Sequence, residues 1–140
     1  SSVTNMTEMF SDCTEFNTLL PASFDTRRVT TMGMMFFRCT KFNTALPASF
    51  DTRRVTNMNG MFGECTAFNK ALPASFDTSS VMDMREMFQD CVNYSKKLPA
   101  SFVIMEGAKI EGLFAGCEGL LKCRHEFEKR SQRGIRRARA

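Results

Sequence analysis

The sequence has few of the residues on which enzyme chemistry depends. Its 140 residues include one His, one Tyr and no Trp. The single His125 lies near the C-terminus, and no nucleophile–base pair, carboxylate pair or Gly-rich phosphate loop is present. General acid–base catalysis needs a titratable group beside the reacting atoms, most often a His. We therefore expect a protein that is not an enzyme and that carries no cofactor.

The chain also lacks a long apolar run and a recognisable targeting signal. No stretch approaches the roughly 20 apolar residues that cross a bilayer, which predicts a chain that does not span a membrane. The sequence does not begin with Met, and neither a signal peptide nor a lipidation motif is recognisable in it. From these residues we expect a processed or excised piece whose cellular location the sequence does not state.

What the sequence has instead is a repeat of 26 residues. Its copies begin at Val3, Val29, Val55 and Val81, and a partial copy runs from Gly107 to Leu121. Self-similarity at this period predicts stacked units, each of which buries its apolar face against its neighbours. The expected organisation is a repeat body and a basic C-terminal cap and tail. The body spans residues 1–121, with copies at 3–28, 29–54, 55–80, 81–106 and 107–121, and the tail spans residues 122–140.

Aligning the copies places similar apolar residues in columns. The clearest columns are Met6, Met32, Met58, Met84 and Ile110; Met9, Met35, Met61, Met87 and Leu113; Phe10, Phe36, Phe62, Phe88 and Phe114; and Phe24, Phe50, Phe76 and Phe102. Within one copy, Met58, Met61, Phe62 and Cys65 stand at i, i+3, i+4 and i+7, which predicts a short helix. The segment 66–72, ended by a proline, is a candidate short strand. Each copy is therefore predicted to form one coil of helix, strand and turn.

The repeated motif resembles a known family. The residues that carry the likeness are Val-Thr-Asn-Met-x-x-Met-Phe-x-x-Cys-Thr-x-Phe-Asn, from Val3 and Val55, and Leu-Pro-Ala-Ser-Phe-Asp-Thr, from Leu20, Leu46 and Leu72. They are similar to the 26-residue bacterial surface protein repeat, a leucine-rich-repeat-like family related to BspA-like proteins. The Phe24 column departs from it, because the family commonly has Trp there.

The resemblance implies both a fold and a use. The implied fold is an α/β repeat, a leucine-rich-repeat-like solenoid of about five coils with short strands, short helices and a C-terminal capping helix. The implied use is surface display, adhesion or protein contacts. This favours a cell-surface or extracellular location and leaves an intracellular or organellar complex open.

The two ends of the array are expected to differ. From Glu118 onward, Leu120, Leu121 and Phe127 are spaced to cover the last coil from a capping helix that stops near Gly134. The first copy has no such cap, so we expect Met6, Phe10 and Phe16 to face outward. We predict that this first coil packs against a partner or against a further stretch of the same chain.

Cysteine and asparagine also recur in columns. Cysteines stand at 13, 39, 65, 91 and 117, with Cys123 beyond them. We favour free buried thiols, because each shares a face with Met and Phe. Disulfides between neighbouring coils are the alternative, and metal binding is disfavoured without a Cys-x-x-Cys pair. The asparagines Asn17, Asn43 and Asn69 predict a ladder of amides that ends at the third coil, with plain surface asparagines as the alternative.

Basic residues are concentrated in two places. Arg27–Arg28 and Arg53–Arg54 occupy equal positions in two successive copies, beside Asp25 and Asp51. They predict either a solvated face with local ion pairs or a surface for an anionic partner. Residues 122–140 carry a net charge of +6, whereas residues 1–121 carry −2. The tail predicts either a solvated or docked segment, or binding to nucleic acid or anionic lipid through charge alone.

These observations favour a non-catalytic module for protein–protein interaction or a structural scaffold. Its expected partners are other proteins, and a place as one subunit of a larger assembly is compatible with this expectation. A surface adhesin fragment is the first alternative, and an anionic-surface binder acting through the tail is the second. Nucleic acid is a disfavoured partner, because the basic stretch 129–140 of the tail has no aromatic residue that could stack on bases. The candidate partner-binding residues are Met6, Phe10, Phe16, Arg27, Arg28, Arg53, Arg54, Arg133, Arg136 and Arg137.

Overall fold

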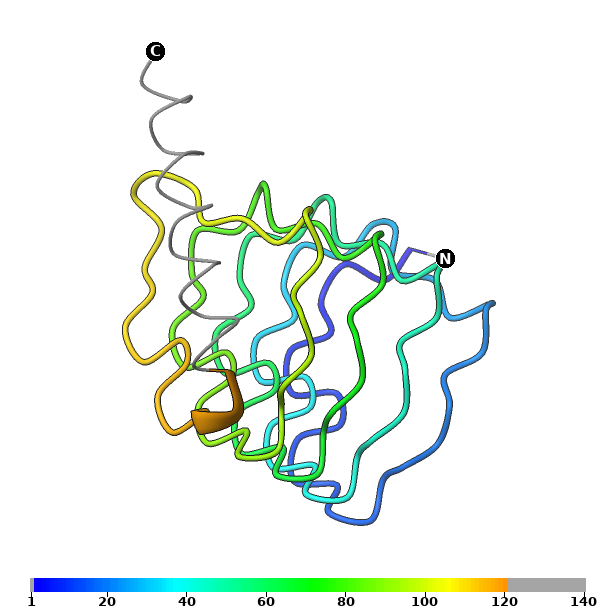
Figure 1. Cartoon of the computed structure of the whole chain (residues 1–140). Coiled ribbons are helices and arrows are strands. Elements are labelled where there is room, and N and C mark those ends of the chain that lie inside the picture. The colour runs from blue at the N-terminus through cyan, green and yellow to red at the C-terminus, as the bar shows by residue number, and fades with distance from the viewer. Residues whose placement is uncertain (1, 121–140) are drawn as a thin grey trace.

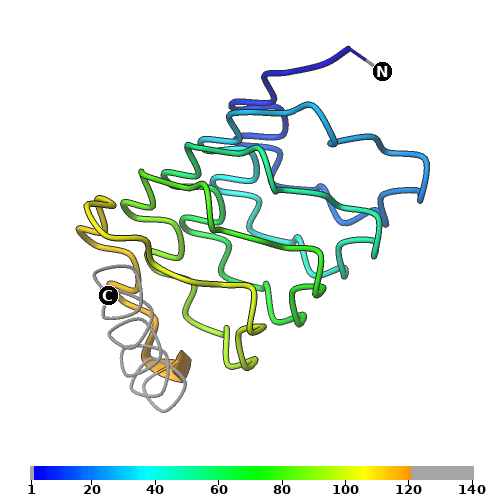
Figure 2. The ribbon, with the colours of Figure 1, turned by 90° about the horizontal axis from the view of Figure 1, so that it is seen from above.

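The polypeptide winds into a stack of coils, shown in Figure 1. The computed structural model describes residues 2–120. Successive coils lie side by side in chain order, as the colours show in both ribbon views (Figures 1 and 2). Isolated parallel backbone bridges join each coil to the next at equivalent positions, namely Asn5, Thr31, Asn57, Asp83 and Lys109. Residues 26 positions apart in the sequence are therefore neighbours in space.

The predicted short helices are absent from residues 2–120, where the one helix is the 3-10 helix η1, Glu118–Leu120. Residues 58–65 and their counterparts form a ribbon of overlapping turns, which we call the turn ribbon. In it, the N–H groups of Met61, Gly63 and Cys65 bond to carbonyls three residues back. The N–H groups of the residues between them donate to the next coil. An α-helix would need those groups for its own bonds to the fourth residue back.

Positive backbone φ angles set the path of the turn ribbon. Each coil has two positive-φ residues four positions apart, for example Glu8 at 60° and Asp12 at 61°. A type II turn requires a positive φ at its third residue, and both residues stand third in a turn closed by an i to i+3 bond. Apolar residues at helical spacing therefore share a buried face on a chain that is not helical.

The predicted strand over residues 66–72 is also absent, and residues 2–120 contain isolated bridges but no strand. In this segment the backbone N–H of Asn69 donates to the side-chain oxygen of Asn43, at 2.9 Å, and not to a backbone carbonyl. The predicted α/β leucine-rich-repeat-like solenoid is therefore wrong. The coils consist of turns and extended chain, and side chains supply part of the bonding that a sheet would provide.

The predicted asparagine ladder is present and longer than expected. The N–H of Asn43 donates to the Asn17 side-chain oxygen at 2.8 Å, and Asn69 repeats this contact on Asn43. The ladder was predicted to end at the third coil because Ser95 replaces the next Asn. Ser95 nevertheless donates its backbone N–H to the Asn69 oxygen at 3.0 Å. The last contact of the ladder needs only a backbone N–H in the fourth coil, so it forms although Ser95 has no side-chain amide.

The core consists of like side chains stacked coil on coil. Phe36, Phe62 and Phe88 are fully buried. Ring centroids in the column that begins at Phe10 are 5.3–5.9 Å apart, whereas those in the column that begins at Phe24 are 6.3–6.5 Å apart. The coils are thus closest at the turn ribbon and spread toward the Phe24 column, which gives the fanned outline of Figure 2.

Buried threonines outside the turn ribbon join each coil to the next. Thr26, Thr52 and Thr78 are at most 1% exposed. The Thr52 hydroxyl donates to the carbonyl of Asp77 and accepts the N–H of the same residue, both at 2.7 Å. One side chain therefore satisfies two backbone groups of the next coil, which would otherwise lie in the core without partners.

The cysteines of residues 2–120 are free thiols, as predicted. Four of them are buried, and each donates its thiol to the carbonyl of a Phe in the preceding coil, as Cys65 does to Phe36 at 2.9 Å. Burial raises the pKa of the Cys39 thiol to about 12. Cys13 in the first coil is exposed. Cys123 lies outside the described residues.

The C-terminal predictions are only partly within the described residues. The segment predicted to form a capping helix begins with the short helix η1, and its remainder, including Leu121, Phe127 and Gly134, lies outside them. The predicted tail, residues 122–140, also lies outside. No helix in residues 2–120 combines the length and the apolar character that a membrane crossing requires.

Candidate interaction surfaces

The first surface is the outer side of the first coil, which we call the open face. Val3 and Met9 are 45% and 49% exposed, whereas their counterparts Val29 and Met35 in the second coil are 0% exposed. Cys13 shows the same contrast with the buried cysteines of the other coils. The open face therefore presents residue types that every inner coil buries.

The structure changes the residues assigned to this face. Met6 is only 6% exposed and belongs to the core, so the prediction that it faces outward is wrong. Phe10 and Phe16 are partly buried, because each stacks on a ring of the second coil, at 5.5 Å from Phe36 and 5.6 Å from Phe42. Val3 and Met9 are exposed where their counterparts in the second coil are fully buried, and neither was among the residues predicted to face outward.

Backbone carbonyls complete the open face. In the turn ribbon, alternate N–H groups of each coil donate to carbonyls of the next coil, as Met6 does to Thr31 at 3.0 Å and Phe10 to Met35 at 2.8 Å. The equivalent carbonyls in the first coil receive no hydrogen bond within residues 2–120. They belong to Asn5, Thr7, Met9 and Ser11.

The last described coil differs from the first. Its core residues Leu113, Phe114 and Cys117 are 5%, 8% and 2% exposed, so they are covered where their counterparts in the first coil are not. Ile110 is 43% exposed in the last coil, but the row of carbonyls without a hydrogen bond within residues 2–120 is found at the first coil.

The second surface is the arginine hollow, lined by Arg27, Arg28, Arg53 and Arg54 and about 290 Å³ in volume. The four arginines lie together, as their equal positions in two successive copies predict. The predicted local ion pair is also present. Arg27 donates through Nε and Nη2 to the two carboxylate oxygens of Asp25, both at 3.0 Å.

Arg53 and Asp51 form the same pair in the second coil. Nε lies 3.1 Å from Oδ1, and Nη2 lies 2.7 Å from Oδ2. Hydrogen bonds from the arginines lower the pKa of both carboxyl groups below the ordinary value, and they raise the pKa of both guanidinium groups. Arg28 and Arg54 are exposed and make no hydrogen bond or ion pair within residues 2–120.

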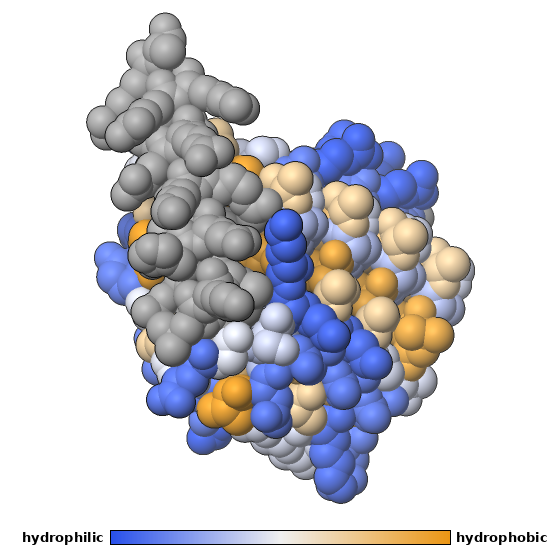
Figure 3. Space-filling model, in the orientation of Figure 1, coloured by the Kyte–Doolittle hydropathy of each residue, from blue (hydrophilic) through white to orange (hydrophobic). Residues whose placement is uncertain are grey.

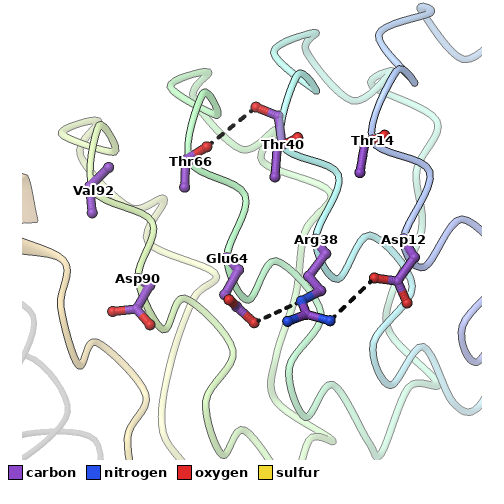
Figure 4. A pocket seen from close by; sticks show the side chains of 8 residues that line it. All are labelled: Asp12, Thr14, Arg38, Thr40, Glu64, Thr66, Asp90 and Val92. Carbon is purple, nitrogen blue, oxygen red and sulfur yellow. Dashed lines mark hydrogen bonds and ion pairs between the residues drawn. The ribbon is translucent and has the colours of Figure 1, made fainter.

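The third surface is a groove of about 380 Å³ across the first four coils, which we call the acidic groove (Figure 4). One wall is the row Thr14, Thr40, Thr66 and Val92, and the other is the row Asp12, Arg38, Glu64 and Asp90. Arg38 bridges two carboxylates, at 3.7 Å from Asp12 and 3.3 Å from Glu64. Figure 3 shows such rows from another side, as bands of like hydropathy that cross from coil to coil.

Comparison with family models decides where the chain belongs. Residues 1–102 match the model described as "Mycoplasma protein of unknown function, DUF285". The chain belongs to the DUF285 family. The match covers the open face, the arginine hollow and the acidic groove. Neither the curated proteins nor the solved structures gave a match to the chain.

The DUF285 match is consistent with a tandem repeat family, and the family description assigns no function. The acidic groove was not predicted from the sequence. The available signal was the column Asp12, Arg38, Glu64 and Asp90, in which a charge recurs at one position of four successive copies. Arg133, Arg136 and Arg137 lie outside the described residues.

No cluster that could hold a metal ion occurs among the His, Cys, Asp and Glu side chains of residues 2–120. The acidic groove has a row of three carboxylates and one guanidinium, which gives the row a net charge of −1. This charge favours binding of a cationic side chain. Its two ion pairs are exposed to solvent, and pairs of this kind contribute at most about 1 kcal/mol each to folding.

Proposed function

We propose that this chain is a non-catalytic protein-interaction module that docks to a partner protein through the open face. The observation that carries the proposal is the change in exposure along the columns, from 0% at Val29 and Met35 to 45% and 49% at Val3 and Met9. Clustered apolar side chains on a surface typically mark an interaction site. Here they adjoin four carbonyls that receive no hydrogen bond within residues 2–120.

The geometry favours a partner that supplies an extended segment. The four carbonyls belong to every second residue from Asn5 to Ser11, and a partner chain that points alternate N–H groups at the open face can add to them by main-chain hydrogen bonds. The segment from Val3 to Phe16 carries three carboxylates, on Glu8, Asp12 and Glu15, and no Lys or Arg. The partner segment is therefore expected to carry apolar and basic side chains and to avoid acidic ones.

This chemistry disfavours a second copy of the same face as the partner. Two open faces in contact would place carbonyls against carbonyls and carboxylates against carboxylates. Neither arrangement forms hydrogen bonds, and like charges in contact are unfavourable. A partner with main-chain N–H donors avoids both problems.

The proposal is tested by selecting a library of displayed 12-residue peptides against the full chain. Selected peptides are expected to alternate apolar with Lys or Arg residues and to protect Cys13 from alkylation. Met9→Gln is expected to weaken their binding at least tenfold. Met82→Gln is the matched control, because Met82 is 45% exposed on the fourth coil.

Two results would overturn the proposal. One is a set of selected peptides that bind the Met9→Gln variant as tightly as the unaltered chain. The other is a dimer in sedimentation experiments that dissociates in the Met9→Gln variant but not in the Met82→Gln variant. That dimer would make a second copy, and not an extended peptide, the partner of the open face.

We also propose a cell-surface setting for this module. The support is the resemblance of the repeat to the bacterial surface protein repeat, which is used for display and adhesion. Protease treatment of intact cells of the source organism tests this setting. The protein is expected to be digested while a cytoplasmic marker survives, and survival of both would contradict it.

A further inference from the structure

The arginine hollow has two kinds of arginine with separate roles. Arg27 and Arg53 are each held by two side-chain hydrogen bonds to a carboxylate. Their positive charges are balanced by Asp25 and Asp51, and their guanidinium planes are held in place as walls. They remain accessible to solvent, with side chains 72% and 74% exposed.

Arg28 and Arg54 supply the unbalanced charge. They occupy equal positions in two adjacent coils and line the same hollow of about 290 Å³. Neither forms a hydrogen bond or an ion pair within residues 2–120. With the two pairs cancelled, the four arginines and two aspartates leave a net charge of +2 around one hollow. In the third coil the positions equivalent to these arginines are occupied by Ser79 and Ser80, so the arginine pairs are confined to the first two coils.

We propose that the arginine hollow binds one doubly charged tetrahedral oxyanion, a phosphate monoester group or inorganic sulfate, between Arg28 and Arg54. A guanidinium group donates two parallel N–H bonds to two oxygens of such a group, which makes Arg the residue best suited to bind it. The net charge of the hollow equals the charge of the dianion with opposite sign. This site is separate from the open face and does not depend on the proposed function.

The surroundings favour a single oxyanion group over a nucleic acid strand. The hollow is lined by arginines alone and offers no aromatic side chain on which a base could stack. Residues 1–121 carry a net charge of −2, so the repeat body as a whole does not supply the excess positive charge that a long polyanion requires. Asp77 lines an adjoining pocket that shares Arg27 and Arg53 with the arginine hollow.

The test titrates the full chain with inorganic sulfate and, separately, with inorganic phosphate at constant ionic strength, and follows the arginine side-chain NMR signals. Saturable shifts are expected at the arginines of the hollow. The Arg28→Gln/Arg54→Gln double variant is expected to bind at least tenfold more weakly. Lys96→Gln/Lys97→Gln removes the same charge from exposed residues of the fourth coil and is expected to bind like the unaltered chain.

The pH of the titration distinguishes the two oxyanions. Phosphate gains its second negative charge between pH 5 and pH 8, with a pKa of about 6 in phosphate esters. Its binding is therefore expected to strengthen over that range. Sulfate binding is expected to stay constant over that range. Equal weakening in the arginine and lysine variants would overturn the proposal, because it would show a general charge effect. Shifts that do not saturate would overturn it as well.

Discussion

Single polar side chains replace backbone pairing at several points between the coils. Thr52 is the clearest case, because its hydroxyl bonds to both backbone groups of Asp77. The asparagine ladder does the same for one N–H group in each coil. These residues recur for a structural reason: each one joins its own coil to the next.

Thr52→Val is expected to destabilise the fold by about 2–4 kcal/mol, because it leaves the N–H and the carbonyl of Asp77 buried without partners. Thr56→Val is the control. The Thr56 hydroxyl is exposed and donates at 3.2 Å to a carbonyl that also receives the Thr56 N–H, so its loss is expected to cost under about 0.5 kcal/mol. Urea denaturation measures both. Equal costs would contradict the role assigned to Thr52.

The thiols are expected to react in a strict order. In a Cys123→Ser background, iodoacetamide at pH 8 is expected to label Cys13 alone in the folded protein. Cys39 is buried and has a pKa raised to about 12, and thiolate is the reactive form. Mass spectrometry of the native and the urea-unfolded protein counts the labels. Rapid labelling of a second thiol under native conditions would show that the core opens.

At the level of the coil, burial could be predicted from the sequence and the backbone path could not. Met58, Met61, Phe62 and Cys65 are 0% exposed, as their spacing predicts. The same spacing is compatible with a helix and with the turn ribbon. The positive φ angles that distinguish the two fall on residues such as Glu64, at 56°. A Gly or Asn there would have signalled the turn, and Glu does not.

Glycine exchanges at one equivalent position are expected to act in opposite directions. Glu86 is exposed with φ at 58°, and Gly60 occupies the same place in the third coil with φ at 60°. Glu86→Gly is expected to stabilise the fold by about 0.5–1 kcal/mol through relief of left-handed strain. Gly60→Ala is expected to cost about 1–2 kcal/mol, and its new Cβ would lie 3.1 Å from Cγ of Met34. Thermal unfolding measures the change in stability of both variants. Destabilisation by Glu86→Gly would contradict the strain assigned to Glu86.

Removing a ring is expected to cost more inside the stack than at the first coil. Phe42 is fully buried and lies 5.6 Å and 5.3 Å from the rings of Phe16 and Phe68. Phe42→Ala is expected to cost about 3–5 kcal/mol, and Phe16→Ala, at a partly buried ring, about half as much. Chemical denaturation of the two variants provides the comparison. Equal losses would indicate that the first coil is covered as well as the second.

Over the whole molecule, the sequence period could predict which copies are neighbours but not the direction of their hydrogen bonds. That direction decides which groups are left at the first coil, and it depends on the turn ribbon. The arginine hollow could be predicted because two adjacent pairs recur at equal positions. The burial of Met6 could not, because its column alone does not tell which side of the first coil each side chain takes.

Acid is expected to destabilise the whole stack. Hydrogen bonds from Arg27, Arg53 and Arg85 lower the pKa values of Asp25, Asp51 and Asp83 in the folded state. Their stabilising effect is therefore complete above the unfolded-state pKa of about 3.9 and is lost as the pH falls below it.

Urea unfolding at pH 6, 4.5 and 3 tests this expectation. The midpoint is expected to change little between pH 6 and 4.5 and to fall between pH 4.5 and 3. The urea midpoint of the Asp51→Asn variant is expected to fall less between pH 4.5 and 3, since Asn at that position does not take up a proton. An equal fall in this variant would assign the acid sensitivity to other carboxyl groups.

The uniform direction of the bonds in the turn ribbon has an electrical consequence. Four columns of N–H groups point toward the next coil and repeat through the stack, while the column of Thr30, Thr56 and Met82 points the other way. Peptide dipoles aligned in this manner add, as they do along a helix axis. The sum places a partial negative charge at the first coil, next to Glu8 and Asp12. The stack is thus a dipole whose negative pole attracts cationic chains before any contact forms, and salt should weaken that attraction.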